Sequence, residues 1–272
     1  MPATELSTTL GRGGPVVCRL GLSASYRPGE RAVRRALDEG INYLFGYAFD
    51  TQMTRVVRSL NADRRERICL ATGGYNWIVW HPSLRKSLEN ALRRLRTDYI
   101  DVFHYLGVMK PSQFGPRVRA ELAELRRDGR IRAVALSCHD RKFAGELAAN
   151  GDVDVVMVRY NAAHPGAERD VFPHVSAHGV GVVAYTATRW TFLLRRPKGW
   201  PEHEPVATAG QCYRFVLSDP HVHVVLTAPR SERELLENLQ EVARGPLPDD
   251  ELAFMRRFGA HVHDRAGWFM GA

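Results

Sequence analysis

Short apolar runs alternate with longer amphipathic segments along the whole chain. Most of these runs lack strict polar alternation, which is typical of parallel strands buried on both faces. We predict eight strands, at residues 17–22, 41–45, 68–72, 100–106, 131–137, 154–160, 181–187 and 222–228. The segments between them carry apolar residues at helical spacing, and the clearest stripe is Leu84, Leu88, Ala91, Leu92 and Leu95.

Turn and cap residues agree with this segmentation. Glycines that suit a left-handed helix cap stand between an amphipathic segment and the next apolar run, at Gly40, Gly129, Gly151 and Gly179. Ser231 and Glu234 have the spacing of a helix capping box. Residues 195–205, with three prolines, are predicted to form a long loop after the seventh strand.

Eight strand–helix units predict the fold class α/β, as a (β/α)8 TIM barrel in a single domain over residues 1–272. The alternative is an open, doubly wound sheet. It is weaker because no G-x-G-x-x-G pattern follows the first strand. In a barrel, we expect the ligand site at the carboxyl-terminal ends of the strands.

Composition narrows the function classes. The chain has 272 residues, 44% of them hydrophobic, and a formal charge of +8. Its arginine pairs fall in several different predicted helices, which favours solvated helix faces over a nucleic-acid-binding patch. No apolar stretch has the length of a membrane span or the form of a signal peptide, so we expect a soluble, cytoplasmic protein.

The four cysteines are far apart, with no C-x-x-C pair. We therefore predict free thiols, mostly buried, rather than disulfides. The histidine pairs His221-x-His223 and His261-x-His263 have no third ligand nearby, so we expect no metal site.

Several segments resemble the aldo-keto reductase family, in that family's order. The most specific is residues 92–101, and the others are residues 19–23, 36–43, 154–161, 179–185 and 237–239. The resemblance covers nearly the whole chain. It implies a (β/α)8 barrel that uses, or once used, NADP(H) without a Rossmann domain.

The family's catalytic tetrad is replaced in this chain. In the family, a tyrosine donates a proton to the carbonyl oxygen, assisted by aspartate, lysine and histidine. The resemblance places the aspartate, tyrosine, lysine and histidine positions at Phe45, Asp50, Gly73 and Leu106. Because a tyrosine with its ordinary pKa of about 10 is a poor acid at neutral pH, ordinary carbonyl reduction is disfavoured.

The cofactor positions implied by the resemblance are partly retained. They are Ser137, Tyr185, Arg230, Ser231, Glu237 and Asn238, whereas Met157 replaces the usual glutamine. NADP(H) is therefore the expected cofactor. The alternative is that residues such as Glu237 and Asn238 now serve only as helix-surface and capping groups.

Other titratable residues are predicted near the barrel mouth. We name Asp50, His104, Tyr47 and Arg159 as candidate catalytic residues, and Tyr75, Trp77, His139 and Trp190 as candidate contacts to a small-molecule substrate. His104 should face the barrel interior, either as a core group or as a proton carrier within reach of Asp50 or Tyr47. Arg159 should also point inward, where it needs an internal salt bridge, for example to Asp50, or an anionic ligand.

These residues leave two hypotheses open. The first is an enzyme with non-standard catalytic residues, which acts by NADP(H)-linked reduction with a relocated proton donor, or by redox-neutral acid/base chemistry as a lyase, isomerase or cyclase. The second is a catalytically inactive NADP(H)-binding or scaffold protein.

Overall fold

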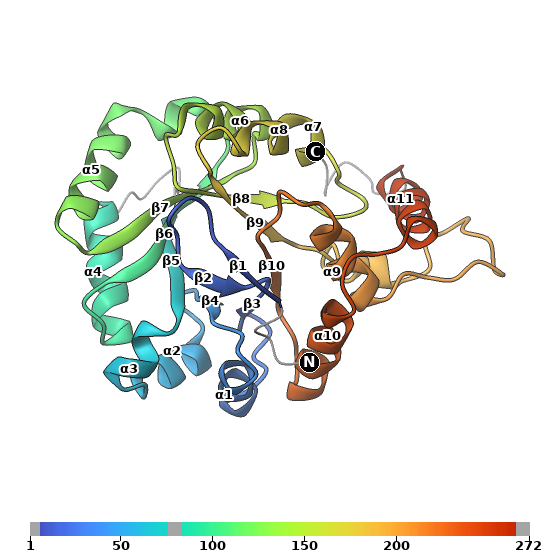
Figure 1. Ribbon diagram of the computed structural model, residues 1–272, viewed down its shortest axis with the longest axis horizontal. Coiled ribbons are helices and arrows are strands. Elements are labelled where there is room, and N and C mark those ends of the chain that lie inside the picture. The colour runs from blue at the N-terminus through green and yellow to red at the C-terminus, as the bar shows by residue number, and fades with distance from the viewer. Residues whose placement is uncertain (1–5, 76–82, 265–272) are drawn as a thin grey trace.

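Eight parallel strands close into a barrel, in the order β10-β3-β4-β5-β6-β7-β8-β9 (Figure 1). The computed structural model describes residues 6–75 and 83–264. The barrel strands are β3 (Leu20–Ser23), β4 (Tyr43–Phe45), β5 (Cys69–Tyr75), β6 (Ile100–Val108), β7 (Ile131–Cys138), β8 (Val155–Arg159), β9 (Gly181–Tyr185) and β10 (Val224–Thr227). The predicted (β/α)8 barrel is confirmed.

Helices surround this barrel on the outside (Figure 1). Among the described residues they are α1 (Glu30–Asp38), α2 (Thr51–Arg58), α3 (Ala62–Glu66), α4 (Leu84–Leu95), α5 (Pro116–Arg127), α6 (Arg141–Asn150), α7 (Ala167–Asp170), α8 (Phe172–Val175), α9 (Ala209–Ser218), α10 (Glu232–Ala243) and α11 (Asp249–Asp264). The apolar stripe predicted on α4 is buried at all five positions. The helices therefore cover the strands with the faces that their spacing predicts.

Side chains of one strand alternate between two cores. In β8, Val155 and Met157 pack inside the barrel, whereas Val156 and Val158 pack between the barrel and the helices. Arg159 has the same parity as Met157 and so points inward at the carboxyl end of the strand. The inward-facing side chains thus fill the interior of the barrel. The inward-facing residues at the carboxyl ends of the strands line its mouth.

The first predicted strand is in fact two strands. Residues Val16–Cys18 form β2, which pairs in antiparallel fashion with β1 (Ser7–Thr9), and only β3 enters the barrel. The backbone changes partner at Arg19, whose N–H donates to Leu6 O at 2.8 Å while its C=O accepts from Val225 N at 2.8 Å. The β1–β2 hairpin lies across the middle of the ring of strands (Figure 1).

The predicted caps and loops are mostly confirmed. The four cap glycines have φ between 65° and 87°, and residues 195–208 form an extended loop beside α11 (Figure 1). The capping box is only half formed: Ser231 Oγ accepts from Glu234 N, but the Glu234 carboxylate accepts from Arg230 N instead of Ser231 N. The glutamate therefore closes the turn one residue earlier than predicted.

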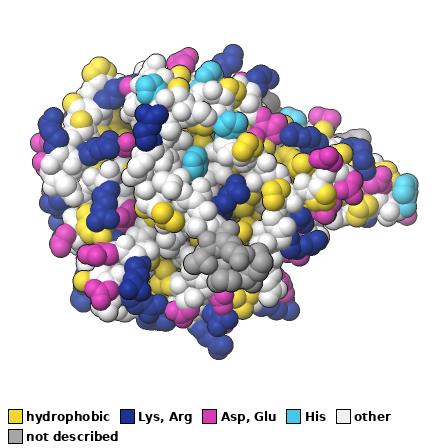
Figure 2. Space-filling model, viewed as in Figure 1, with side chains coloured by type: hydrophobic (Ala, Val, Ile, Leu, Met, Phe, Trp, Pro, Cys, Tyr) yellow, Lys and Arg dark blue, Asp and Glu magenta, His cyan; other side chains and the backbone are white. Residues whose placement is uncertain are grey.

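All four cysteines are free and buried, as predicted. Basic and acidic side chains are interspersed over the face shown in Figure 2. Within residues 6–75 and 83–264, no helix has the length and apolarity needed to cross a membrane.

A buried charge network lies at the amino-terminal end of the barrel. Asp101, near the start of β6, is 3% exposed. Its carboxylate accepts from Arg65 Nη1 at 2.8 Å, from Arg132 Nη1 at 3.0 Å and from Leu70 N at 3.0 Å. Both guanidinium groups also lie over the ring of Tyr99, 4.1 and 3.9 Å from its centroid. Each buried charge in this network therefore has a partner of opposite sign.

Candidate active site

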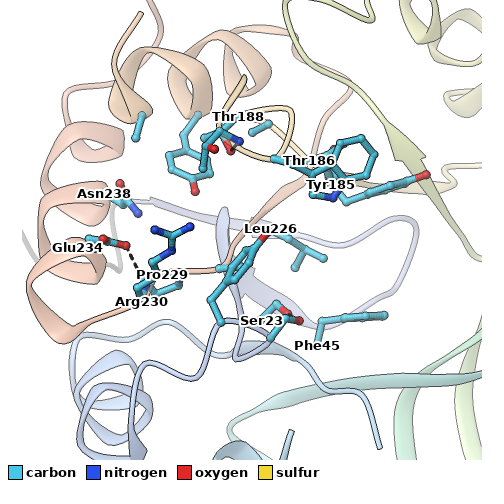
Figure 3. Close-up of a pocket in the computed structure, with 18 of the residues that line it drawn as sticks. Ser23, Phe45, Tyr185, Thr186, Thr188, Leu226, Pro229, Arg230, Glu234 and Asn238 are labelled. Carbon is cyan, nitrogen blue, oxygen red and sulfur yellow. Dashed lines mark hydrogen bonds between the residues drawn. The ribbon is translucent and has the colours of Figure 1, made fainter. Parts of the chain in front are cut away.

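A cavity of about 550 Å³ opens at the carboxyl-terminal ends of the strands. One end, over the barrel mouth, is lined by Phe45, Tyr47, Met157 and Tyr185, and the other end is lined by the turn and helix that follow β10. Figure 3 shows Leu226 between these ends, with Phe45 and Tyr185 on one side and Arg230, Glu234 and Asn238 on the other. This is the end at which barrel enzymes hold their ligands.

Four of the six predicted cofactor residues line this cavity: Tyr185, Arg230, Glu237 and Asn238. The guanidinium of Arg230 lies over the ring of Tyr26, 5.6 Å from its centroid. Asn238 Nδ2 donates to Thr227 Oγ1 at 3.1 Å, so the end of β10 orients this amide. Glu237 forms an exposed ion pair with Arg233 at 3.6 Å.

The other two predicted cofactor residues lie outside the cavity lining. Ser231 caps α10, where its hydroxyl accepts from Glu234 N at 3.2 Å. Ser137 is buried in β7, directly beside Met157 in the pairing of β7 with β8. Because Met157 lines the cavity, Ser137 is one residue away from it.

Phe45 occupies the floor of the mouth, at the position where we placed the family's aspartate. Its ring meets Tyr47 edge-on at 4.9 Å and His104 edge-on at 5.3 Å. The phenyl ring therefore contacts the mouth on one side and the deeper barrel interior on the other.

His104 is a barrel-core residue in this structure. It is 0% exposed, and its Nε2 lies 3.4 Å from the Tyr43 hydroxyl. Its Nδ1 has no hydrogen-bond partner among the described residues. Burial lowers the pKa of His104 to about 3, so the ring is neutral. The contact with Asp50 or Tyr47 that would make it a proton carrier is not formed.

Asp50 supports a loop beneath the mouth. Its side chain is 4% exposed and does not line the cavity. Asp50 Oδ2 accepts from Tyr47 N at 2.8 Å, and Arg94 Nη1 donates to Tyr47 O at 3.3 Å. Burial raises the pKa of the Asp50 carboxyl, while the Tyr47 N–H and Arg94 act in the opposite direction. Asp50 and Arg94 thus hold the loop that presents Tyr47.

Tyr47 is the member of this group that lines the cavity. Its ring stacks on Phe49 at 5.0 Å and on Tyr75 at 6.2 Å. Burial raises the pKa of Tyr47, and so do Tyr75, Asp50 and Tyr185. No lysine or arginine among the described residues lowers the pKa of Tyr47, in contrast to the arrangement that the family resemblance implies.

Gly73, at the position where we placed the family's lysine, leaves no room for a side chain. A Cβ atom built on Gly73 would overlap the carbonyl oxygen of His104 on the neighbouring strand and lie 2.9 Å from His104 Cβ. The backbones of β5 and β6 therefore occupy the space that any side chain would need here.

The remaining candidates that the structure describes lie around the rim. Arg159 ends β8 and pairs in register with Tyr185. The internal salt bridge predicted for Arg159 is not formed with any described residue. His139 follows β7, and Trp190 lines the cavity. Tyr75 ends β5, while Trp77 lies outside the described residues.

Besides the predicted Trp190, the loop after β9 contributes cavity residues that sequence reasoning missed, among them Thr186, Thr188 and Thr191. Four non-glycine residues of this loop have positive φ: Thr186 (57°), Arg189 (49°), Trp190 (51°) and Thr191 (71°). Such backbone is strained, and strained backbone is concentrated at functional sites. Glycine is the usual sign of left-handed backbone, and it is missing from this loop, so the sequence carries no local signal for the turn.

Metal-ligating side chains are not grouped in the part of the chain that the structure describes. His221 Nδ1 bonds to Asp219 Oδ1 at 2.9 Å, and His223 Nδ1 accepts from Val182 N at 3.1 Å. The first predicted histidine pair is therefore engaged in local hydrogen bonds.

A closed (β/α)8 barrel with such a cavity across its carboxyl-terminal end has the architecture of a small-molecule enzyme. The sequence model of the aldo/keto reductase family matches residues 23–204, so the chain belongs to this family. The predicted family resemblance is confirmed.

Individual relatives agree with this assignment. The chain is 23% identical over 256 residues to an uncharacterized oxidoreductase of Bacillus subtilis, YqkF, covering 80% of this chain and 83% of that protein. It is 30% identical over 108 residues to the NADH-specific methylglyoxal reductase of Escherichia coli, covering 38% and 32% of the two chains. The solved structure of aldo-keto reductase AKR11C1 from Bacillus halodurans, in its holo form, shares the fold with a TM-score of 0.76 at 24% identity, over 93% of this chain and 95% of that chain.

Proposed function

We propose that this protein is an NADP(H)-dependent oxidoreductase that reduces a small carbonyl compound, with Tyr47 as its proton donor. One observation carries the proposal. Of the three candidate donors, Tyr47, Asp50 and His104, only Tyr47 lines the cavity that also contains the predicted cofactor residues. A proton donor must reach the carbonyl oxygen, so Asp50 and His104 are less suitable.

The cavity residues fit a nicotinamide dinucleotide. Tyr185 offers an aromatic ring at the mouth, while Arg230 and Asn238 offer polar groups at the far end. When bound there, the cofactor supplies the hydride for reduction. Arg230 suits an additional phosphate, whereas Glu234 and Glu237 at the same end suit free ribose hydroxyls. NADH is therefore the competing cofactor that a binding experiment must include.

Tyr47 would be a weak acid in this setting, because each of its charged or titratable neighbours raises its pKa. Such a donor suits a reactive carbonyl that even a weak acid can activate, for example an α-oxoaldehyde. The name of the E. coli relative refers to a substrate of this kind.

Cofactor titration followed by turnover tests the proposal. We expect calorimetry to detect binding of NADPH, and Tyr47→Phe to lower kcat for methylglyoxal reduction about 100-fold or more while the NADPH affinity stays unchanged. Tyr99→Phe is the matched control, because its hydroxyl lies at the other end of the barrel and has no described partner. Equal rates for wild type and Tyr47→Phe would exclude Tyr47 as the donor.

The raised pKa of Tyr47 also supports a second candidate, a catalytically inactive NADP(H)-binding protein. Binding of NADPH without oxidation of the cofactor by any carbonyl compound would favour this candidate. An absence of binding by both NADPH and NADH would exclude both candidates.

A further inference from the structure

Five basic side chains gather on one side of the barrel mouth, at the carboxyl ends of β7, β8 and β9. This cationic cluster consists of the charged Arg141, Arg159 and Arg189 together with His139 and His164. Burial and the charge of Arg159 lower the pKa of both histidines, that of His164 to about 3, so the positive charge comes from the arginines. Arg159 is close enough to act electrostatically on His139, His164 and Arg189, and it is itself affected by Arg141. The cluster is therefore one electrostatic unit built from several loops.

The members differ in how their charge is compensated. Arg141 forms an ion pair with Asp170 at 3.3 Å, and Arg189 Nη1 donates to Val262 O near the end of α11 at 3.0 Å. Arg159 is half-buried and has no hydrogen-bond or carboxylate partner among the described residues. Burial and the positive charge of Arg141 lower the pKa of Arg159. An uncompensated, partly desolvated guanidinium is costly, so the site favours an anion.

Two buried polar atoms in the cluster also lack partners. His164 is 4% exposed and Arg189 is 2% exposed, and neither His164 Nε2 nor Arg189 Nε has a partner among the described residues. His164 Nδ1 lies 3.2 Å from Asn161 Oδ1. That oxygen also accepts from Ala163 N, so His164 Nδ1 carries the hydrogen and Nε2 is an open acceptor, which a ligand hydroxyl or a water can satisfy. Arg189 Nε is the open donor that suits an anion. Buried unsatisfied groups of this kind are rare unless a ligand or water completes them.

The cluster adjoins the reacting end of the cavity. Arg159 is the register partner of Tyr185, which lines the cavity, and it follows Met157 on the inward-facing side of β8. Tyr185 in turn acts electrostatically on Tyr47. A substrate whose carbonyl group reaches Tyr47 can therefore extend past Tyr185 toward Arg159.

We propose that the cationic cluster binds an anionic group of the substrate, a carboxylate or a phosphate, with Arg159 as the principal contact. This inference rests on the proposed function, because it assigns the substrate class of the same site: small carbonyl compounds that carry a negative charge. Guanidinium groups bind both kinds of anion through charge-assisted hydrogen bonds.

Anion binding can be measured without turnover. Calorimetric titration of the apo protein with inorganic phosphate and, separately, with pyruvate distinguishes the two anion types. We expect at least one of them to bind, and Arg159→Gln to weaken that binding about tenfold or more. Arg34→Gln, an exposed residue on α1, removes the same charge away from the mouth and should leave binding unchanged.

Thermal unfolding separates a ligand-binding arginine from a structural one. Arg159→Gln removes a charge that its neighbours repel, so we expect its Tm to equal or exceed that of wild type. A clear fall in Tm together with unchanged anion affinity would show a structural role and overturn the proposal. Unchanged affinity for both anions alone would also overturn it.

The proposed function can fail separately. If Arg159→Gln weakens NADPH binding in place of phosphate or pyruvate binding, the cluster belongs to the dinucleotide site and the proposal is wrong. If wild type binds pyruvate or phosphate through Arg159 but binds neither NADPH nor NADH, the anion site stands and the oxidoreductase function fails. With both sites intact, wild type should have a higher kcat/KM for pyruvate relative to methylglyoxal than Arg159→Gln has.

Discussion

Each end of the barrel holds an arginine partly or fully out of water, Arg65 at the amino-terminal end and Arg159 at the mouth, but the groups that face the two arginines differ. At the amino-terminal end, Arg65 and Arg132 share the buried carboxylate of Asp101. At the mouth, no described carboxylate pairs with Arg159. A complete charge network serves the fold, whereas an incomplete one is ready for a ligand. The difference supports the proposed anion site at the mouth and a structural role for the charge network at the amino-terminal end.

The largest effect is expected at the amino-terminal end. Asp101→Asn leaves two guanidinium groups without their carboxylate, so the free energy of unfolding should fall by about 3–5 kcal/mol in urea denaturation. Asp128→Asn is the control, because Asp128 forms an exposed ion pair with Arg85 and should cost about 1 kcal/mol at most. Equal losses for the two variants would contradict the distinction drawn between the two ends.

Substitutions of Gly73 test whether the space between β5 and β6 at the mouth can hold a side chain. Gly73→Ala should lower the free energy of unfolding by about 1–3 kcal/mol, because its Cβ would overlap the His104 carbonyl. Gly73→Lys should be at least as unstable and should not raise carbonyl reduction. Gly115→Ala, whose Cβ would have only an ordinary contact at 3.7 Å, should change stability little. A stable and more active Gly73→Lys would disprove the steric argument.

A more gradual effect concerns the pH dependence of stability. The folded pKa of His104 is about 3, below its value near 6.5 in the unfolded chain, so the unfolded state binds more protons between these values. Stability contributed by the neutral ring is present above pH 6.5 and is lost as the pH falls toward 3. In His104→Leu this contribution is absent, so the free energy of unfolding should fall less steeply with decreasing pH than in wild type. The difference in slope should be about 1.4 kcal/mol per pH unit between the two pKa values.

Denaturant titrations at pH 7, 6 and 5 measure that slope. The control is His203→Leu, which replaces an exposed histidine. An unchanged slope in His104→Leu would show that His104 is not held neutral in the folded protein.

Much of the barrel could be predicted from local pattern. The strands and helix faces follow from apolar spacing, because each element buries the side that its own sequence makes apolar. The division at Arg19 could not be predicted, since it depends on two backbone partners, Leu6 and Val225, that lie far apart in the sequence. A continuous apolar run does not show where the chain stops pairing with one strand and begins to pair with another.

The candidate site was predictable in a different way. Strand parity correctly predicts that His104 and Arg159 point inward, because side chains alternate along a strand. Parity does not tell which residue faces them across the barrel. Asp50 binds the backbone of Tyr47 instead of Arg159, and His104 meets Tyr43 and Phe45. Those contacts join different strands and loops, so they arise only when the barrel closes.

The sequence by itself determined the barrel and the family, and it predicts that Phe45, Asp50, Gly73 and Leu106 stand at the family's tetrad positions. The tertiary structure decided that Tyr47 lines the cavity, that Gly73 has no space for a side chain, and that Arg159 has no described counter-charge. The physical reason is one of range. Periodicity and caps act over a few residues, whereas access, steric exclusion and charge compensation depend on groups that folding brings together from distant parts of the chain.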